Sequence, residues 1–153
     1  MVTQVETKSL YDQDFCLWAE TMANLLKNRQ LDHLDYENLI EEIEDMSGSQ
    51  KDALESNLEV LLMHLLQWQY QPEKITYSWR YTIFEHRKRI FKAFRKSPSL
   101  KRHFDHVIDE VYDDARKSAS VETRLSLKTF PENNPFTKEE ILNEAYPSGL
   151  IPN

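Results

Sequence analysis

The chain has 153 residues, of which 40% are hydrophobic and 29% are charged, and this composition is typical of a globular domain rather than a disordered chain. It has only two glycines, Gly48 and Gly149, so a fold built from tight β-hairpins is disfavoured. A net charge of −7 disfavours generic nucleic-acid binding. No apolar run reaches the ~20 residues that a membrane span needs. The single cysteine, which rules out an internal disulfide, fits a reducing cytoplasm.

The N-terminal half predicts two helices. Residues 12–28 carry apolar side chains at helical spacing, and Asp12 is placed to cap this helix. Residues 35–70 carry a second apolar stripe that ends at Trp68, and Asp35 is placed to cap it. Both helices therefore have one face suited to a protein core.

The stripe of the second helix fades over residues 47–52, around Gly48. An unbroken helix over residues 35–70 would be about 54 Å long, whereas a domain of this size has a diameter of roughly 40 Å. Two interpretations stay open. The helix breaks or kinks at Gly48, which we favour, or it is continuous and its overhanging part needs a partner.

The C-terminal half predicts two further main helices, over residues 78–96 and 98–119, separated at a proline that suits a first helical turn. Residues 121–135 are expected to form an extended arm. Thr137 and Glu140 have the spacing of a capping box, which indicates a short last helix. We therefore expect an all-α fold: an antiparallel bundle of about four main helices plus a short C-terminal helix and an extended arm. It would form a single helical domain over residues 1–153, with loose termini at 1–10 and 147–153.

Several motifs occur in order along these segments. They are Tyr11-Asp12-x-Asp14-Phe15-x-x-Trp18, Leu34-Asp35-x-Glu37-Asn38-Leu39-Ile40-Glu41-Glu42-Ile43-Glu44-Asp45-Met46, His64-Leu65-Leu66-x-Trp68-Gln69-Tyr70-Gln71-Pro72, Ser97-Pro98-Ser99-Leu100 and Phe130-Pro131. On these motifs the chain resembles the bacterial family catalogued as domain of unknown function 29, over nearly all of residues 11–146. The resemblance implies an all-helical fold, and it implies no activity, substrate or cofactor.

Carboxylates and histidines supply the candidate metal ligands. Glu41, Glu44 and Asp45 share one side of a helix and can hold a hard cation. His64 and His86 fall at similar distances from the turn between their helices, so an antiparallel pair brings them together. Runs of charge are usually solvated surface, and buried histidines usually bond to nearby polar groups. We therefore favour structural roles for all five residues and predict no cofactor.

The strongest charge asymmetry is a run of basic residues with no acid among them: Arg87, Lys88, Arg89, Lys92, Arg95, Lys96, Lys101 and Arg102. Such a run can bind phosphates, an acidic partner, or the acidic second helix of the same chain, and we favour complementarity within the chain. Tyr70 and Tyr77 are candidates for an exposed recognition surface, because tyrosine combines an apolar body with a polar tip.

No nucleophile elbow, P-loop or Cys-x-x-Cys motif is present in the sequence, so we lean toward a protein that is not an enzyme. The leading hypothesis is a non-catalytic protein-interaction or regulatory domain of the cytoplasm. Its partner would be a protein, and a second copy of the chain is one such partner; no membrane is expected. Two alternatives stay open: a metal-dependent bundle enzyme that uses His64 and His86 with carboxylates, and a nucleic-acid-binding protein that uses residues 87–102.

Overall fold

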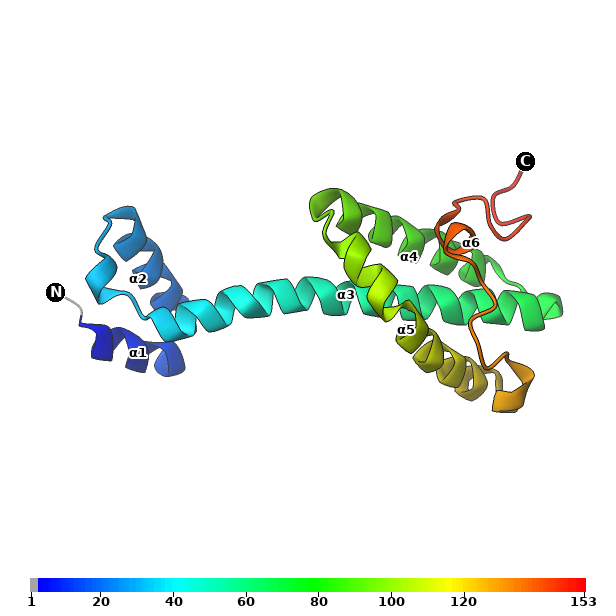
Figure 1. Ribbon diagram of the computed structural model, residues 1–153, viewed down its shortest axis with the longest axis horizontal. Helices are drawn as coiled ribbons and strands as arrows, with labels where there is room; N and C mark the ends of the chain where they lie inside the picture. Colours follow the sequence, from blue (N-terminus) through cyan, green and yellow to red (C-terminus); the bar gives the residue numbers. More distant parts are fainter. Residues whose placement is uncertain (1–2) are drawn as a thin grey trace. The chain divides into compact units, whose positions relative to one another are not determined.

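The computed structural model describes residues 3–153, and these residues form helices and loops without a β-strand (Figure 1). This confirms the predicted all-α helical bundle. Contacts divide the chain into two compact units, Met1–Ser49 and Gln50–Asn153, which we call the first unit and the second unit. The prediction of a single domain over residues 1–153 stays a prediction.

The first unit contains α1 (Gln4–Gln13), α2 (Phe15–Lys27), the 3-10 turn η1 (Leu31–His33) and the start of α3 (Tyr36–Tyr70). Its core is small and consists of four buried side chains: Trp18, Met22, Leu25 and Leu34. The partly buried Leu10, Tyr11 and Leu39 pack against it, so each helix of the unit contributes to the same core. Tyr11 also donates a hydrogen bond of 2.5 Å to the carboxylate of Glu42 on α3.

The predicted loose N-terminus over residues 1–10 is wrong for residues 4–10, which belong to α1, and residues 1–2 lie outside the described residues. Thr3 and Glu6 form a capping box, in which the Thr3 hydroxyl accepts from the Glu6 amide at 3.2 Å and the Glu6 carboxylate accepts from the Thr3 amide at 2.9 Å. The cap predicted at Asp12 is also wrong. The chain bends at Asp14, whose carboxylate accepts from the Leu17 amide at 3.0 Å, so α1 ends and α2 begins there.

Helix α3 runs through Gly48 without interruption, so the favoured break at this residue is wrong. A glycine inside a helix costs only about 1 kcal/mol relative to alanine, which favourable packing elsewhere in the helix readily offsets. The start was predicted correctly, because Asp35 accepts a hydrogen bond from the Asn38 amide at 3.4 Å and thereby caps α3.

The second unit contains the C-terminal part of α3, then η2 (Pro72–Lys74), α4 (Tyr77–Lys96), α5 (Leu100–Thr123), η3 (Leu127–Thr129) and α6 (Lys138–Leu142). Helix α4 returns along α3 after a short turn, so the two are antiparallel, and α5 crosses them (Figure 1). Twenty buried hydrophobic side chains form one core here, compared with four in the first unit. Most of the stability gained from apolar burial therefore belongs to the second unit.

The segment after α5 is fixed to this core by isolated apolar side chains. Phe130, Phe136 and Ile141 are buried in it, and the predicted capping box of Thr137 with Glu140 starts α6. Leu150 is also buried, at 4% exposure, so the prediction of a loose C-terminus is wrong at this residue. The carbonyls of Ile141 and Gly149 accept hydrogen bonds from Arg87 and Arg80 of α4, so the chain from α6 to Leu150 lies beside α4.

Candidate functional site

One side of α4 is left open by the rest of the second unit. Thr76 starts this helix, since its hydroxyl accepts a hydrogen bond from the Trp79 amide at 3.2 Å. The residues on the open side are spaced by four, three, four, three and four positions, which places them in one row along the helix. This row, the α4 face, consists of Tyr77, Tyr81, Phe84, Lys88, Phe91 and Arg95. Its first three members are 90%, 64% and 46% exposed, which is high for large aromatic side chains.

The C-terminal segment borders the α4 face, and three adjoining hollows lie along it. The first has a volume of about 670 Å³ and is closed by residues 149–152. The second, of about 230 Å³, shares Phe84 with the first. The third, of about 430 Å³, shares Phe91 and Arg95 with the second. Neighbouring hollows share lining side chains and therefore follow one another along α4, and we call this row of three hollows the α4 groove. Its helical side spans about 27 Å from Tyr77 to Arg95 at 1.5 Å per residue.

The lining of the α4 groove is aromatic and basic. Six basic side chains contribute to it, namely Arg80, Arg87, Lys88, Arg95, Lys101 and Lys138, against the single acid Glu144. Three of the six have other contacts, and one of these is Arg87, which donates to the Ile141 carbonyl. Lys138 pairs with Asp105 at 2.6 Å, and Arg80 lies over the ring of Trp68 and donates to the carbonyl of Gly149. The groove therefore favours negatively charged ligands.

The predicted basic cluster is divided by the helix. Lys88 and Arg95 line the groove, whereas Lys92 and Lys96 are exposed without lining any of its three hollows. Arg89 is exposed and pairs with Glu85 at 3.3 Å, one turn earlier on α4. The cluster is therefore not a single basic surface.

Arg87 is not on the surface, contrary to its assignment as a surface candidate. It is 2% exposed because it follows Ile83 by four positions and precedes Ile90 by three, which places it on the side of α4 that packs in the core. Its Nε donates to the backbone carbonyl of Ile141 at 2.8 Å. Burial lowers the pKa of Arg87 to about 10, while the charge of Glu144 opposes this shift.

The two tyrosines singled out in the sequence have different environments. Tyr77 is 90% exposed and lines the α4 groove. Tyr70 is half-buried, because it packs edge-on against Phe130 with ring centroids 5.6 Å apart. The expectation of an exposed Tyr70 is therefore wrong. Tyr81 and Phe84 belong to the groove, and their i, i+3 spacing beside Tyr77 was the sequence signal for them.

His64 and His86 are half-buried, and each bonds to its own helix. The Nδ1 atom of His64 lies 2.9 Å from the carbonyl of Val60, and that of His86 lies 2.9 Å from the carbonyl of Thr82. Burial lowers the pKa of His64, and the charge of His86 lowers it further. The charge of His86 thus acts on His64, and each ring has a local hydrogen-bond partner on its own helix.

The acidic metal candidates and the two histidines belong to different units. Glu41, Glu44 and Asp45 are exposed and belong to the first unit, whereas His64 and His86 belong to the second. Within residues 3–153 no three side chains of His, Cys, Asp or Glu are arranged to hold a metal ion.

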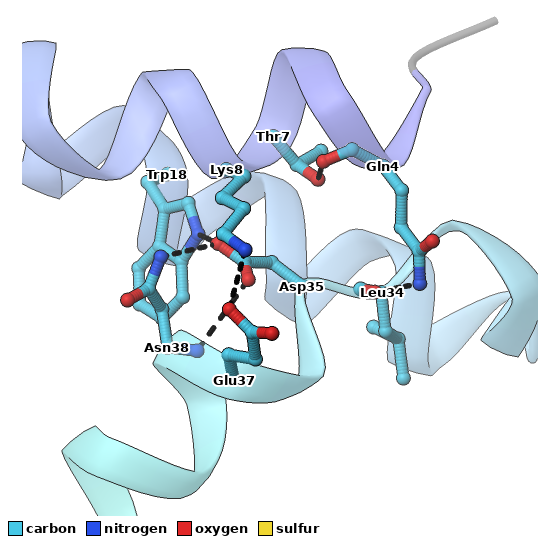
Figure 2. Close-up of polar contacts among 8 residues, drawn as sticks. All are labelled: Gln4, Thr7, Lys8, Trp18, Leu34, Asp35, Glu37 and Asn38. Atoms are coloured by element: carbon cyan, nitrogen blue, oxygen red, sulfur yellow. Dashed lines mark hydrogen bonds and ion pairs between the residues drawn. The ribbon is translucent and has the colours of Figure 1, made fainter.

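A polar cluster in the first unit surrounds the buried carboxylate of Asp35 (Figure 2). The indole Nε1 of Trp18 donates to Asp35 Oδ2 at 3.1 Å, and the side-chain amide of Asn38 donates to the same oxygen at 2.7 Å. Because both oxygens of Asp35 accept hydrogen bonds, the cluster connects α2 to the cap of α3 and has a structural role. Sequence reasoning identified the cap but not the bond from Trp18.

Comparison with protein families gives one match. The family model described as "Domain of unknown function DUF29" matches residues 10–147. The chain belongs to this family. Searches of curated proteins and of solved structures each found no significant match.

The first two of the motifs that carry the resemblance to the DUF29 family meet in the first unit. Tyr11 and Trp18 from the first motif contact each other with ring centroids 4.9 Å apart. Each of them bonds to a carboxylate of the second motif, Tyr11 to Glu42 and Trp18 to Asp35. These two DUF29 motifs thus account for the packing of α1 and α2 against the start of α3.

No helix in the described part of this DUF29 protein is both long enough and apolar enough to cross a membrane.

Proposed function

We propose that the chain is a non-catalytic protein-interaction domain, and that its α4 groove docks an acidic amphipathic helix of a partner protein. The observation that carries this proposal is the row of exposed aromatic side chains on α4. Tyr77, Tyr81 and Phe84 follow the three-four spacing with which one helix contacts another along its length. Tyrosine is also among the residues that contribute most to binding energy at protein interfaces.

The dimensions of the groove support a helical partner. Its helical side spans about 27 Å, which corresponds to roughly five turns of a docked helix at 5.4 Å per turn. The volume of about 670 Å³ at the Tyr77 end is suited to large apolar side chains of the partner.

The charge of the groove supports an acidic partner. Lys88 and Arg95 lie in the same row as the aromatic side chains, and Lys101 continues the positive charge beyond Pro98. Glutamate and aspartate on the flanks of a docked helix would lie near these cations, which favours specific orientation and fast association. A basic or neutral helix gains no such attraction.

The test uses a designed amphipathic helix that has leucine at three-four spacing and glutamate on both flanks, titrated into the full chain by calorimetry. We expect Tyr81→Ser with Phe84→Ser to weaken binding at least tenfold, since loss of a central aromatic contact costs about 2 kcal/mol or more. Matched substitutions of Val121 to Ser and Lys117 to Glu, both at exposed positions of α5, should change binding less than twofold.

Three outcomes would contradict the proposal. Equal binding by the wild type and the Tyr81/Phe84 variant would show that the α4 groove is not the docking site. Dimerisation in solution that the same variant abolishes would make a second copy the occupant. Salt-sensitive binding of a DNA or RNA duplex that Lys88→Glu with Arg95→Glu abolishes, without binding of the acidic helix, would favour nucleic-acid recognition.

A further inference from the structure

The guanidinium of Arg87 is the one buried cation in the lining of the α4 groove. It is 2% exposed, and only its Nε has a hydrogen-bond partner, the carbonyl of Ile141. Within residues 3–153 neither Nη1 nor Nη2 has a partner, although both nitrogens are buried. Four N–H donors of one cation are therefore left without an acceptor.

Arg87 cannot avoid this cost by losing its proton. A pKa of about 10 keeps the guanidinium charged at neutral pH, in spite of its burial. Buried charges in proteins are normally paired, because removing an ion from water is costly unless another group replaces the hydration. The unpartnered donors thus indicate that a molecule other than residues 3–153 supplies their acceptor.

The surroundings of Arg87 specify the charge and size of that acceptor. The hollow that it lines has a volume of about 230 Å³, and the other lining residues are Phe84, Lys88, Phe91, Arg95 and Glu144, so that Arg87 is the third cation of the lining. Three cations and one anion give this lining a net positive charge, so an anion is favoured. The hollow is smaller than the roughly 300–1,000 Å³ of typical ligand pockets, which suits one acidic side chain better than a cofactor.

Glu144 does not fill this role in the structure. Its charge acts on Arg87, yet no ion pair joins the two side chains among the described residues. Glu144 is exposed at the rim of the hollow. It therefore competes with an incoming anion and does not replace it.

We propose that the hollow beside Arg87 is a carboxylate-binding site that receives one glutamate or aspartate side chain of the helix docked in the α4 groove. This inference rests on the proposed function and makes it more specific. The two Nη groups of a guanidinium match the two oxygens of a carboxylate, which lysine cannot do. Lys88 and Arg95 add attraction without having to contact the same oxygens.

The first experiment tests the site without any helix. N-acetylglutamate amide, which presents a single side-chain carboxylate, is titrated into the full chain, and its neutral counterpart N-acetylglutamine amide serves as control. The Nε–H signal of Arg87 in a ¹⁵N-correlated NMR spectrum reports binding at this residue. We expect the acid to shift this signal and the amide to leave it unchanged. We also expect Arg87→Lys to weaken binding of the acid at least tenfold and Lys117→Glu to change it less than twofold.

The second experiment identifies the source of the carboxylate. Helices that differ only in having glutamate or glutamine at the position facing Arg87 are compared, and the glutamate form should bind at least tenfold more tightly. Equal affinity of the two helices, together with binding of the small acid, would mean that the site takes free carboxylates and would overturn the side-chain assignment. Binding of the small acid without binding of either helix would refute the proposed function and leave the carboxylate site intact.

Glu144→Gln provides the decisive control. If the hollow accepts an external carboxylate, this variant should bind N-acetylglutamate amide two- to fivefold more tightly, because a competing negative charge is gone. If Glu144 is itself the partner of Arg87 in solution and the hollow accepts no external anion, the variant should have a lower melting temperature, and added acid should not restore it. That second result would overturn the carboxylate site.

Discussion

Replacing Arg87 by methionine should leave the second unit as stable as the wild type or make it more stable. Substitution at a buried position of a helical core normally lowers the free energy of unfolding. The contacts of the Arg87 side chain are the reason that we expect no such loss here. Methionine is similar in length, lacks charge and adapts to irregular packing. It therefore removes the buried charge without leaving a large cavity.

The magnitude follows from two opposing contributions. Loss of the 2.8 Å hydrogen bond from Arg87 Nε to the Ile141 carbonyl costs about 1.5–3 kcal/mol, as for other bonds to charged groups. Removal of a buried cation whose Nη1 and Nη2 have no partner within residues 3–153 returns several kcal/mol. Replacing buried charged groups by hydrophobic residues of similar volume is often neutral or stabilising by about 1–4 kcal/mol. We expect the free energy of unfolding to rise by about 0–2 kcal/mol.

The assay is urea unfolding of the full chain, followed by tryptophan fluorescence and by circular dichroism. Ile90→Ala, on the same buried side of α4, is the control and should destabilise by about 2–5 kcal/mol. A loss of more than 1 kcal/mol in Arg87→Met would refute the reasoning, because the Nη groups must then have acceptors in the free protein. Saturating N-acetylglutamate amide should reverse the order, since it stabilises only the wild type.

Three further predictions concern other parts of the chain. Asp35→Ala should destabilise the first unit by about 2–4 kcal/mol, because it removes a helix cap and the acceptor for the indole of Trp18. Amide hydrogen exchange in α2 measures this loss, and Asp32→Ala, at an exposed position, is the control. Gly48→Ala should stabilise the protein by about 0.5–1 kcal/mol in thermal unfolding, because the added methyl group meets nothing within 4 Å. A loss of stability in that variant would contradict a continuous α3. For His64, burial lowers the pKa below its ordinary value of 6.5, so the unfolded chain takes up the proton first. Its contribution to stability is complete above pH 6.5 and is lost as the pH falls below that value; an NMR titration of the ring that gives a pKa above 6.5 would refute this.

Helix positions were predictable wherever a cap and an apolar stripe occur together. Asp35 and Thr137 both cap helices at the positions that their sequence patterns indicated. Helix α1 was missed although Thr3-Gln4-Val5-Glu6 has the spacing of a capping box, because residues 4–13 have few apolar side chains. In this segment the capping box is a better indicator of the helix than the apolar stripe.

The prediction at Gly48 failed for a different physical reason. A continuous helix over residues 35–70 exceeds the diameter of one compact domain, but the structure divides the chain into two units, and α3 contributes to both. Local signals favoured continuity, since the apolar positions keep their helical phase from Met46 to Leu54. A single glycine without a following proline is too weak a signal to end a helix whose phase continues.

Arg87 shows which property of the sequence decides the position of a charged side chain in a helix. Counted with its basic neighbours, it belongs to a run of charge and was expected on the surface. Counted by phase, it lies between Ile83 and Ile90 in a repeat of buried positions, and its side chain is buried as that phase requires. The helical phase decides the position of this side chain, because burying the neighbouring isoleucines stabilises the protein by more free energy than burying one charge costs.

The sequence does not predict the position of residues 141–144. These residues are distant from Arg87 in the chain, and they give it a carbonyl partner and give its hollow an acidic rim. A basic residue in the buried phase of an otherwise apolar helix is thus a reason to look for an anion, and the stability of Arg87→Met with and without a carboxylate is the measurement that decides whether one binds.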